Sequence, residues 1–233
     1  MCIVSNRKAL VEDGLLTVEE DLRVSELVLK RKPKSPESFF HRQWLLRFLY
    51  SKNLLTNELL TEELAVCLNA AHQYASNYYA WNHRYYIVDK FFRNDLNFML
   101  EENELIKRWI HNHISDYSGY HYKQMVLSII LGALADRNQK DRLVELLNNE
   151  NANSKKLIQI YPNQEALFCH KRYLLKMRYL HVGLDENDLK EEQEFVRQSY
   201  NQAKKFENNW LVIMTNRYVR WIEYACKIQL DVK

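Results

Sequence analysis

Three histidines are the first residues in this sequence that could do chemistry, because imidazole is a common metal ligand. His111 and His113 lie close together, and His121 follows shortly after. Residues two apart on a helix point to different sides, however, and no acidic residue stands at the spacing that a metal site needs. The sequence therefore predicts no metal site. It also contains no glycine-rich phosphate loop and no serine elbow.

The acidic and sulfur-bearing residues do not form a catalytic group either. The runs Glu101-Glu102 and Glu191-Glu192 are expected to lie on solvent-facing sides of helices. The four cysteines are far apart and lack paired spacing, which favours neither a disulfide framework nor a cysteine-based zinc site: Cys2, Cys67, Cys169 and Cys226. We expect no catalytic residue and no bound cofactor in this chain, and a reducing compartment.

One motif combines an aromatic ring, a histidine and a cation at Trp81, His83 and Arg84. Asn77 precedes it as a good helix N-cap, because its side-chain oxygen can accept from the free amides of the first turn. From Trp81 an apolar stripe runs at helical spacing, through Tyr85, Val88 and Phe92. The motif thus belongs to a helix that must bury one face.

Degraded copies of this motif recur along the chain. They place signature residues at Phe39, His41 and Arg42, at Tyr120 and Lys123, at Phe168, His170 and Lys171, and at Arg217, with a partial copy at Arg7. The successive cations, Arg7, Arg42, Arg84, Lys123, Lys171 and Arg217, are separated by 35, 42, 39, 48 and 46 residues. Such a period holds two helices and two turns, and it is typical of a solenoid whose units bury their apolar faces against neighbours.

Most of these signature residues are expected to be structural. Trp81 should be core, and Arg84 should hydrogen-bond backbone carbonyls or an acid of the adjacent helix, as a buried guanidinium must. The positions just before and early in each second helix are more open, because helix N-termini present free amides and a positive dipole. These rim positions are candidates for meeting a partner or an anion: Ser76, Asn77, Tyr78, Asp116, Tyr117 and His121.

The composition favours an all-α fold. Only 4 Gly and 3 Pro stand against 47% hydrophobic residues, which leaves little room for the turns of a sheet. We expect a single domain over residues 1–233, with about five repeats and a half repeat at the N-terminus. The helix that starts at Asn77 is expected to end near Arg93, in the regular alternation of first and second helices. One departure is predicted, an asparagine-interrupted pair of helical pieces around residues 148–151.

The charge balance argues against nucleic acid as a partner, since 33 Lys plus Arg interleave with 30 Asp plus Glu. The local exception is the basic run at residues 30–34, which is either a solvated helix end or a contact for an anionic partner. No stretch is apolar enough for a membrane span, and no signal peptide precedes the first helix. We expect a soluble, cytoplasmic protein.

The motif at residues 77–84 resembles the repeat of protein prenyltransferase α subunits, and the segments at 36–42, 116–124 and 165–172 resemble a repeat-containing branch of that family. The resemblance implies a right-handed α-α superhelix that wraps a β subunit of the Rab geranylgeranyltransferase type. That subunit would hold zinc, the isoprenoid diphosphate and the acceptor cysteine at the C-terminus of a protein substrate. In farnesyltransferase-type members a lysine near the diphosphate stands two residues before the tyrosine that Tyr78 matches, and here that position is Ser76.

Two hypotheses of different classes follow. In the first, the chain is a non-catalytic α subunit that supports geranylgeranyl transfer to protein cysteines by a β subunit. In the second, it is a free-standing helical-repeat scaffold without prenyl chemistry. Tetratricopeptide scaffolds repeat at about 34 residues, so the longer intervals seen here favour the first.

The N-terminal copy around Arg7 lacks both a partner helix and an aromatic residue, because Val4 stands in the aromatic position. Its apolar residues, Ile3, Val4, Leu10 and Val11, would then need a cover. We expect that the chain is a shortened form of a longer protein or that a partner covers this end, and that the isolated chain self-associates.

Overall fold

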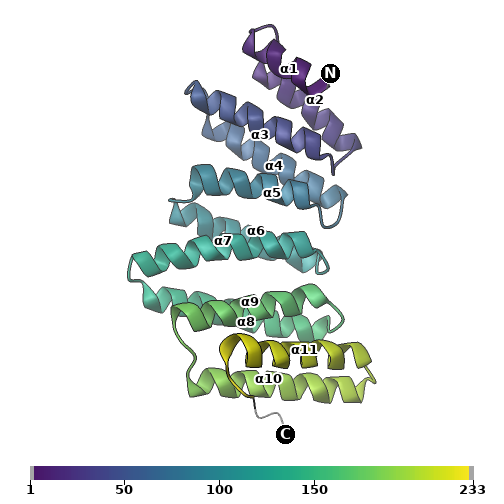
Figure 1. Cartoon of the computed structure of the whole chain (residues 1–233), viewed down its shortest axis with the longest axis vertical. Helices are drawn as coiled ribbons and strands as arrows, with labels where there is room; N and C mark the ends of the chain where they lie inside the picture. Colours follow the sequence, from purple (N-terminus) through teal and green to yellow (C-terminus); the bar gives the residue numbers. More distant parts are fainter. Residues whose placement is uncertain (1–2, 231–233) are drawn as a thin grey trace. The chain divides into compact units, whose positions relative to one another are not determined.

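The computed structural model describes the backbone of residues 3–230 and the side chains of residues 6–230. Within this range the chain forms helices and no strand (Figure 1). The helices are α1 (Ile3–Glu12), α2 (Val18–Arg31), α3 (Pro36–Ser51), α4 (Asn57–Gln73), α5 (Tyr78–Ile87), the π-helix η1 (Val88–Phe92), α6 (Leu96–Asn112), α7 (Tyr117–Asp136), α8 (Lys140–Ile160), α9 (Glu165–His181), α10 (Glu186–Lys205) and α11 (Asn209–Cys226). The all-α prediction, with helical hairpins as its repeating unit, is confirmed.

The helices form two compact units, Met1–Met99 and Leu100–Lys233. In the first unit α2 pairs with α3 and α4 pairs with α5, while α2 also contacts α4 and α3 contacts α5. We call the even-numbered helices from α2 to α10 A helices, and the odd-numbered helices from α3 to α11 B helices. Each hairpin therefore supplies one A and one B helix, and like helices lie side by side.

The second unit repeats this arrangement. Here α8 pairs with α9 and α10 with α11, and the B helices α7, α9 and α11 contact one another in that order (Figure 1). Polar contacts join the A helices, since Gln159 of α8 bonds to both Gln198 and Gln202 of α10. The same two-layer plan thus holds inside each unit.

Helix starts follow the capping rules that the sequence obeys. Thr17 and Glu20 form a capping box at the start of α2, and Asn77 accepts from the amide of Ala80 at the start of α5. Gly14, just after α1, has a φ of 72°, a conformation that costs glycine little. Local sequence therefore fixes where these helices begin and end.

The helix after Asn77 differs from the regular α-helix that its stripe predicts. Trp81 and Val88 are buried, but α5 gives way to the π-helix η1 at Val88. A π-turn widens the helix by a residue, so the side chains that follow change direction. Phe92 therefore leaves the buried stripe and stacks on Phe98, with ring centroids 4.0 Å apart.

The asparagine-rich stretch at residues 148–151 does not interrupt a helix, contrary to expectation. Instead α8 runs continuously from Lys140 to Ile160. Its buried residues, Leu143, Leu147, Glu150, Ser154, Leu157 and Ile158, recur at helical spacing on one face. Tertiary packing of this face outweighs the weak helix propensity of asparagine.

The N-terminal end is better anchored than its sequence suggests. Val11 of α1 is buried in a cluster with Val18 and Leu22 of α2 and Leu45 and Leu49 of α3. Leu10 remains 41% exposed, while the side chains of Ile3 and Val4 lie outside the described residues. The expectation that the isolated chain self-associates stays a prediction.

Replacing Trp81 by alanine should destabilise the protein by about 3 to 5 kcal/mol, because the indole is 2% exposed and its removal leaves a cavity in the core. Urea unfolding measures this loss. Ser76→Ala is the control and should cost little, because serine and alanine bear the same strain at the positive φ of 52° found there. A Trp81→Ala variant within about 0.5 kcal/mol of the parent, as surface changes are, would show that this residue is not core.

Candidate functional site

A buried carboxylate organises the motif in the first unit. Glu63 of α4 accepts hydrogen bonds from Nε and Nη2 of the Arg42 guanidinium of α3, with Nε at 3.0 Å from Oε2, and its Oε2 lies 3.2 Å from Nε2 of His83 of α5. All three side chains are buried. Burial acts to raise the pKa of Glu63, but the bond from His83 and the charge of Arg42 hold it below its usual value. The carboxylate is thus kept ionised between two B helices.

The same arrangement occurs one repeat earlier. Asp21 of α2 accepts a hydrogen bond from Nε of Arg7 of α1 at 2.6 Å, and its other oxygen lies 2.7 Å from Nε2 of His41 of α3. We call this arrangement a carboxylate clamp: an acid of an A helix that contacts the ring of its own hairpin and the cation of the odd-numbered helix before it. The partial copy at Arg7 is therefore a working member of the repeat.

Two further clamps lie in the second unit. Glu150 of α8 accepts from Nζ of Lys123 at 2.9 Å, and Asn103 of α6 contacts both groups. Glu192 of α10 accepts from Lys171 of α9 and, at 2.7 Å, from the hydroxyl of Tyr218 of α11. Burial opposes ionisation of Glu192, but the charges of Lys171 and Lys155 and the hydrogen bonds from Lys171 and Tyr218 together hold the pKa of this carboxyl below its usual value.

The ring position of the motif tolerates histidine or tyrosine. Tyr122 donates to Glu102 of α6 at 2.5 Å, in the place that His83 takes against Glu63. His170 faces the Glu150 clamp but neither of its ring nitrogens has a hydrogen-bond partner. Burial lowers the pKa of His170 to about 3, so the ring is neutral. A ring that donates to, or simply packs beside, the acid is sufficient here.

Sequence reasoning missed the buried acids that contact the ring positions. Glu102 and Glu192 were expected on solvent faces, but they are 4% and 2% exposed. They turn inward because the buried cations and rings of neighbouring helices need an acceptor. A signal was present, since the acid lies 20 residues before its ring at Asp21, Glu63 and Glu102.

The expected copy at Arg217 is out of register. Arg217 is exposed on α11 and lies 3.4 Å from Glu165, so it is not a buried signature cation. Tyr218, one residue later, fills the ring position, and the residue in the cation position is then Val219. In the described residues no A helix follows α11. No clamp acid within them therefore needs a cation at position 219.

The other signature residues lie where a structural role requires. Phe39, Trp81, Tyr120 and Phe168 are buried, as are His41, His83, His170, Arg42, Arg84, Lys123 and Lys171. Arg84 donates to the backbone carbonyl of Leu64 at 2.6 Å. These groups are committed to holding helices together.

The rim position Asn77 also links helices. Besides capping α5, its Nδ2 donates to the carbonyl of Pro33 at 2.6 Å and to that of Ala70 at 3.2 Å. It thereby ties the loop before α3 to the loop before α5. Ser76 is half-buried beside it, whereas Tyr78 is 53% exposed at the first residue of α5.

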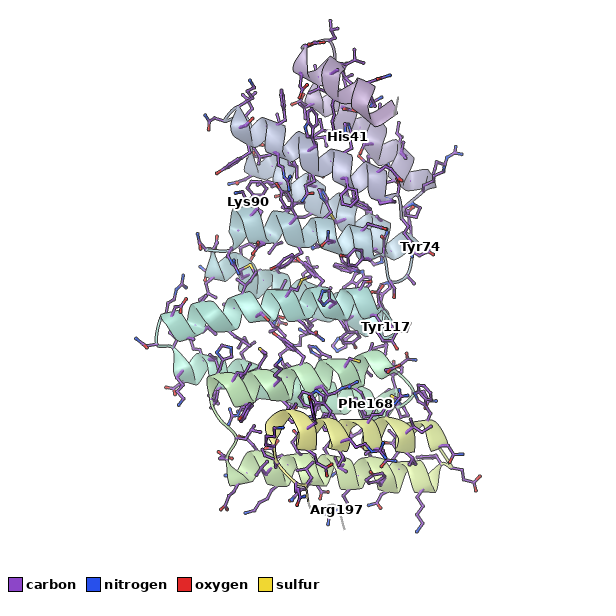
Figure 2. The ribbon with its side chains drawn as sticks, in the orientation of Figure 1. His41, Tyr74, Lys90, Tyr117, Phe168 and Arg197 are labelled. Atoms are coloured by element: carbon purple, nitrogen blue, oxygen red, sulfur yellow. The ribbon has the colours of Figure 1, made fainter. Side chains whose placement is uncertain are left out.

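The second-unit rim has the same division. Asp116 is buried and accepts from the amide of Gly119 at 2.7 Å, while Tyr117 is 50% exposed at the start of α7 (Figure 2). A Cβ on Gly119 would come within 2.7 Å of the ring of Trp109, so only glycine fits. His121 is exposed on the next turn of α7. At each rim, therefore, the tyrosine is exposed and the capping residue before it is buried.

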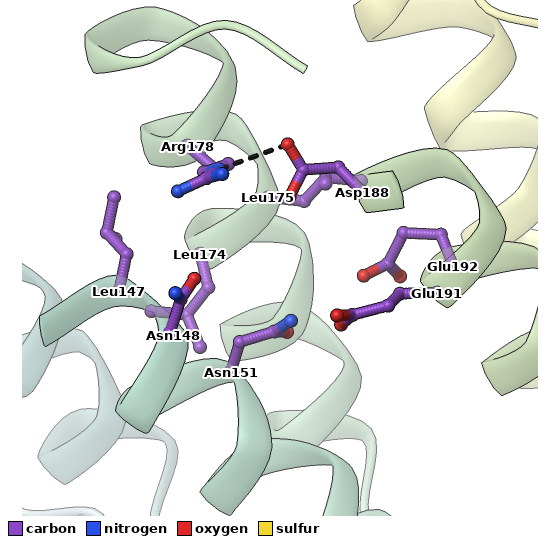
Figure 3. Close-up of a pocket in the computed structure, with 9 residues that line it drawn as sticks. All are labelled: Leu147, Asn148, Asn151, Leu174, Leu175, Arg178, Asp188, Glu191 and Glu192. Atoms are coloured by element: carbon purple, nitrogen blue, oxygen red, sulfur yellow. Dashed lines mark hydrogen bonds and ion pairs between the residues drawn. The ribbon is translucent and has the colours of Figure 1, made fainter. Parts of the chain in front are cut away.

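Two hollows lie between helices of the second unit, and neither is an enclosed ligand site. One of about 30 Å³ lies between α8, α9 and α10, where Arg178 and Asp188 pair at 3.2 Å beside Asn151 (Figure 3). That volume accommodates a water or two rather than a cofactor. A wider hollow of about 460 Å³ between α8 and α10 is lined by charges that already pair, such as Lys155 with Glu191.

Across residues 3–230 no group of three or more His, Cys, Asp and Glu side chains is placed to hold a metal ion. In that range no helix combines the length and hydrophobicity of a membrane span.

Comparison with known proteins relates the clamp-bearing hairpins to one repeat family. The protein prenyltransferase alpha subunit repeat matches residues 18–49 and 60–91. These matches cover α2 with most of α3, and α4 with α5 and most of η1. They therefore coincide with the two hairpins that contain the Asp21 and Glu63 clamps.

Several proteins resemble this chain over most of its length. Protein prenyltransferase alpha subunit repeat-containing protein 1 of Homo sapiens is 30% identical over 217 residues, covering 74% of this chain and 54% of the relative. The protein of the same name from Danio rerio is 30% identical over 208 residues, covering 72% and 49%. Geranylgeranyl transferase type-2 subunit alpha of Homo sapiens is 27% identical over 183 residues, covering 75% of this chain and 30% of the relative. The chain thus spans about half the length of the first two relatives.

Removing the charge of a clamp should be costly. Glu63→Gln leaves the buried Arg42 without its counter-charge, so we expect a loss of about 3 to 5 kcal/mol in urea unfolding. Glu62→Gln, at the exposed neighbouring position, is the matched control and should change stability by less than about 0.5 kcal/mol. Equal effects of the two substitutions would mean that the clamp contributes nothing.

His170 should make stability depend on pH above the range where carboxylates titrate. Its pKa is lowered from 6.5 to about 3, so the unfolded chain binds a proton that the folded chain excludes. Its contribution is complete above about pH 6.5 and is lost as pH falls, by at most about 1.4 kcal/mol per pH unit. His170→Phe cannot take up that proton.

Urea unfolding at pH 6.5 and pH 5 measures the difference. The parent should lose up to about 2 kcal/mol more than His170→Phe over this interval. Parallel losses in the two proteins would show that His170 is protonated in the folded state.

Proposed function

This chain carries protein prenyltransferase alpha subunit repeats, and from that premise we propose that it is the α-type subunit of a heterodimeric protein prenyltransferase. In this role it does not transfer the prenyl group itself. It supports a β subunit, of the type that modifies Rab proteins, which holds zinc and transfers a geranylgeranyl group to a cysteine near the C-terminus of a protein substrate.

The observation that carries the proposal is the extended similarity to a named transferase subunit. Geranylgeranyl transferase type-2 subunit alpha aligns with 75% of this chain, well beyond one hairpin. An alignment of that length extends over several hairpins, so it supports a shared mode of assembly.

The contrast between buried and exposed residues of the motif also favours a non-catalytic role. The cations and rings of the repeat are buried against clamp acids, so they are unavailable to a substrate. At the start of α5 and α7, by contrast, Tyr78 and Tyr117 are 53% and 50% exposed. Tyrosine is enriched in protein interfaces because it joins a large apolar ring to a hydroxyl. We assign these two residues to contact with the β subunit.

The position that is lysine in farnesyltransferase-type relatives is Ser76 here, half-buried and with a φ of 52°. A serine cannot supply a cation to a diphosphate. Charge stabilisation of the leaving diphosphate would therefore come from the β subunit, with Tyr78 offering at most a hydroxyl.

A second candidate is a free-standing scaffold for protein interaction. It is favoured by the names of the relatives at 30% identity, which describe a repeat and state no activity. The two candidates differ in whether a prenyltransferase β subunit is a partner.

The test is co-expression of the tagged chain with a Rab-type β subunit. We expect co-purification as a stable pair, and transfer of a geranylgeranyl group from its diphosphate to a cysteine-tailed protein only when both chains and zinc are present. Transfer by this chain alone would contradict the supporting role. A β subunit that never co-purifies would favour the scaffold.

The double variant Tyr78→Ala/Tyr117→Ala should weaken that association by at least about tenfold, since each interface tyrosine contributes about 1 kcal/mol or more. Its unfolding free energy should change little, because neither side chain is buried. Tyr179→Ala/Tyr224→Ala removes two other exposed tyrosines, near the ends of α9 and α11, and is the control. Parental affinity in the rim double variant would place the interface elsewhere.

A further inference from the structure

A cluster of cations at the end of α2 is used neither by the clamps nor by the proposed function. Four cations lie within five residues, and all are exposed: Lys30, Arg31, Lys32 and Lys34. Lys30 pairs with Glu26 at 3.0 Å on the surface, where such pairs are weak. Arg31, Lys32 and Lys34 form no ion pair with any of the described residues. This end of α2 therefore carries positive charge that is open to an anionic partner.

The loop that follows α2 is held in place by the next hairpin. Asn77 donates from Nδ2 to the carbonyl of Pro33 at 2.6 Å. The ammonium of Lys34 lies over the ring of Tyr74, 4.6 Å from its centroid. Tyr74 is 44% exposed at the C-cap of α4, at the same edge of the first unit (Figure 2). Because the loop is already fixed, a partner need not pay to order it.

An exposed leucine lies on the same side of α2 as the first two cations. Leu27 is 61% exposed, and Lys30 and Arg31 follow it three and four residues later, which places the three side chains together. Leu27 stands six residues after the buried Asp21. The residue at that spacing from the buried acid is also exposed in the other A helices, but it is polar there: Asn69, Arg108, Lys156 and Gln198. The exposure of Leu27 is thus usual for this position, and its apolar character is particular to α2.

An apolar side chain flanked by cations on one exposed side of a helix fits an anionic membrane surface. Interfacial helices place their apolar side chains among the acyl chains and their cations at the headgroups. Each lysine or arginine near an anionic leaflet strengthens binding about fivefold, and tyrosine is enriched at the same depth. An acidic protein segment would pair with the cations but leave Leu27 in water. The combination therefore favours a lipid surface over an acidic peptide.

We propose that this edge of the first unit binds anionic phospholipids at a membrane surface. We call it the α2 basic edge, and it consists of Leu27, Lys30, Arg31, Lys32, Lys34 and Tyr74. Leu27 enters the headgroup region, and the cations meet the phosphate and carboxylate groups of the lipids. Binding is weak and reversible, because the edge buries one leucine. It requires no β subunit, so the chain alone tests it.

Co-sedimentation with lipid vesicles tests the binding. The chain should bind vesicles of phosphatidylcholine with about 30% phosphatidylserine but not phosphatidylcholine alone, and added salt should release it because screening weakens the attraction. Absence of binding to the anionic vesicles would overturn the proposal. If the chain binds a soluble polyglutamate peptide but no vesicle, the partner is an acidic protein and the membrane proposal is wrong.

Reversing two charges tests the role of the cations. Lys32→Glu/Lys34→Glu should raise the lipid concentration needed for half-maximal binding at least about tenfold. Lys52→Glu/Lys90→Glu is the matched control, because both lysines are exposed in the first unit and each lies over an aromatic ring. They lie at the opposite edge, where Lys90 is labelled (Figure 2), so binding should change much less. Equal losses would mean that net charge alone sets the affinity and that the α2 basic edge is not the contact.

A substitution of the leucine separates a lipid surface from other anionic partners. Leu27→Asn introduces the residue found at the equivalent position of α4, and it should weaken vesicle binding at least about threefold because less apolar surface is buried. Leu54→Asn is the control, since Leu54 is 63% exposed in the turn after α3. Circular dichroism checks that each variant keeps its helices. Binding of Leu27→Asn at parental strength would contradict a membrane as the partner.

Discussion

A carboxylate buried between helices is the constraint on which the rest of this structure depends. Moving an ionised acid out of water costs several kcal/mol, and only well-placed counter-charges and donors offset that cost. Glu63 meets this condition by accepting from Arg42 of one hairpin and from His83 of its own. Neither hairpin can shift without leaving a buried charge uncompensated. The clamp therefore fixes how one repeat sits on the next inside a unit.

The clamps also explain why a motif rich in histidine and cations is not a reactive site. A histidine, an arginine and an acid in close contact resemble catalytic machinery, but in the Glu63 clamp these three groups bond to one another. The chemistry left free lies at the helix starts, where Asn77 and Asp116 are consumed as caps and the tyrosines after them face outward. The exposed residues of the motif are thus the tyrosines at helix starts, and these are the residues that we propose to contact a partner.

The sequence predicted the helical hairpins, the caps at Asn77 and Asp116, and the burial of Trp81, because these follow from local spacing and capping chemistry. It did not predict the burial of Glu102 and Glu192, since an acid in a polar run reads as solvated until the cation facing it is known. Nor did it predict the π-helix at Val88 or the unbroken α8, where tertiary packing decides against local preference. In the last copy, Arg217 matches the motif in sequence but is exposed, whereas Tyr218 makes the buried contact of the ring position, to Glu192.

A double-mutant cycle on Arg42 and Glu63 tests the central claim most directly. The unfolding free energies of the parent, Arg42→Met, Glu63→Leu and the double variant give the coupling between the two side chains. Either single change leaves an uncompensated buried group. The account therefore predicts that the double variant loses at least about 2 kcal/mol less unfolding free energy than the two single variants lose together. Additive losses, with coupling below about 0.5 kcal/mol, would contradict the account, because the carboxylate would then not be what joins one repeat to the next.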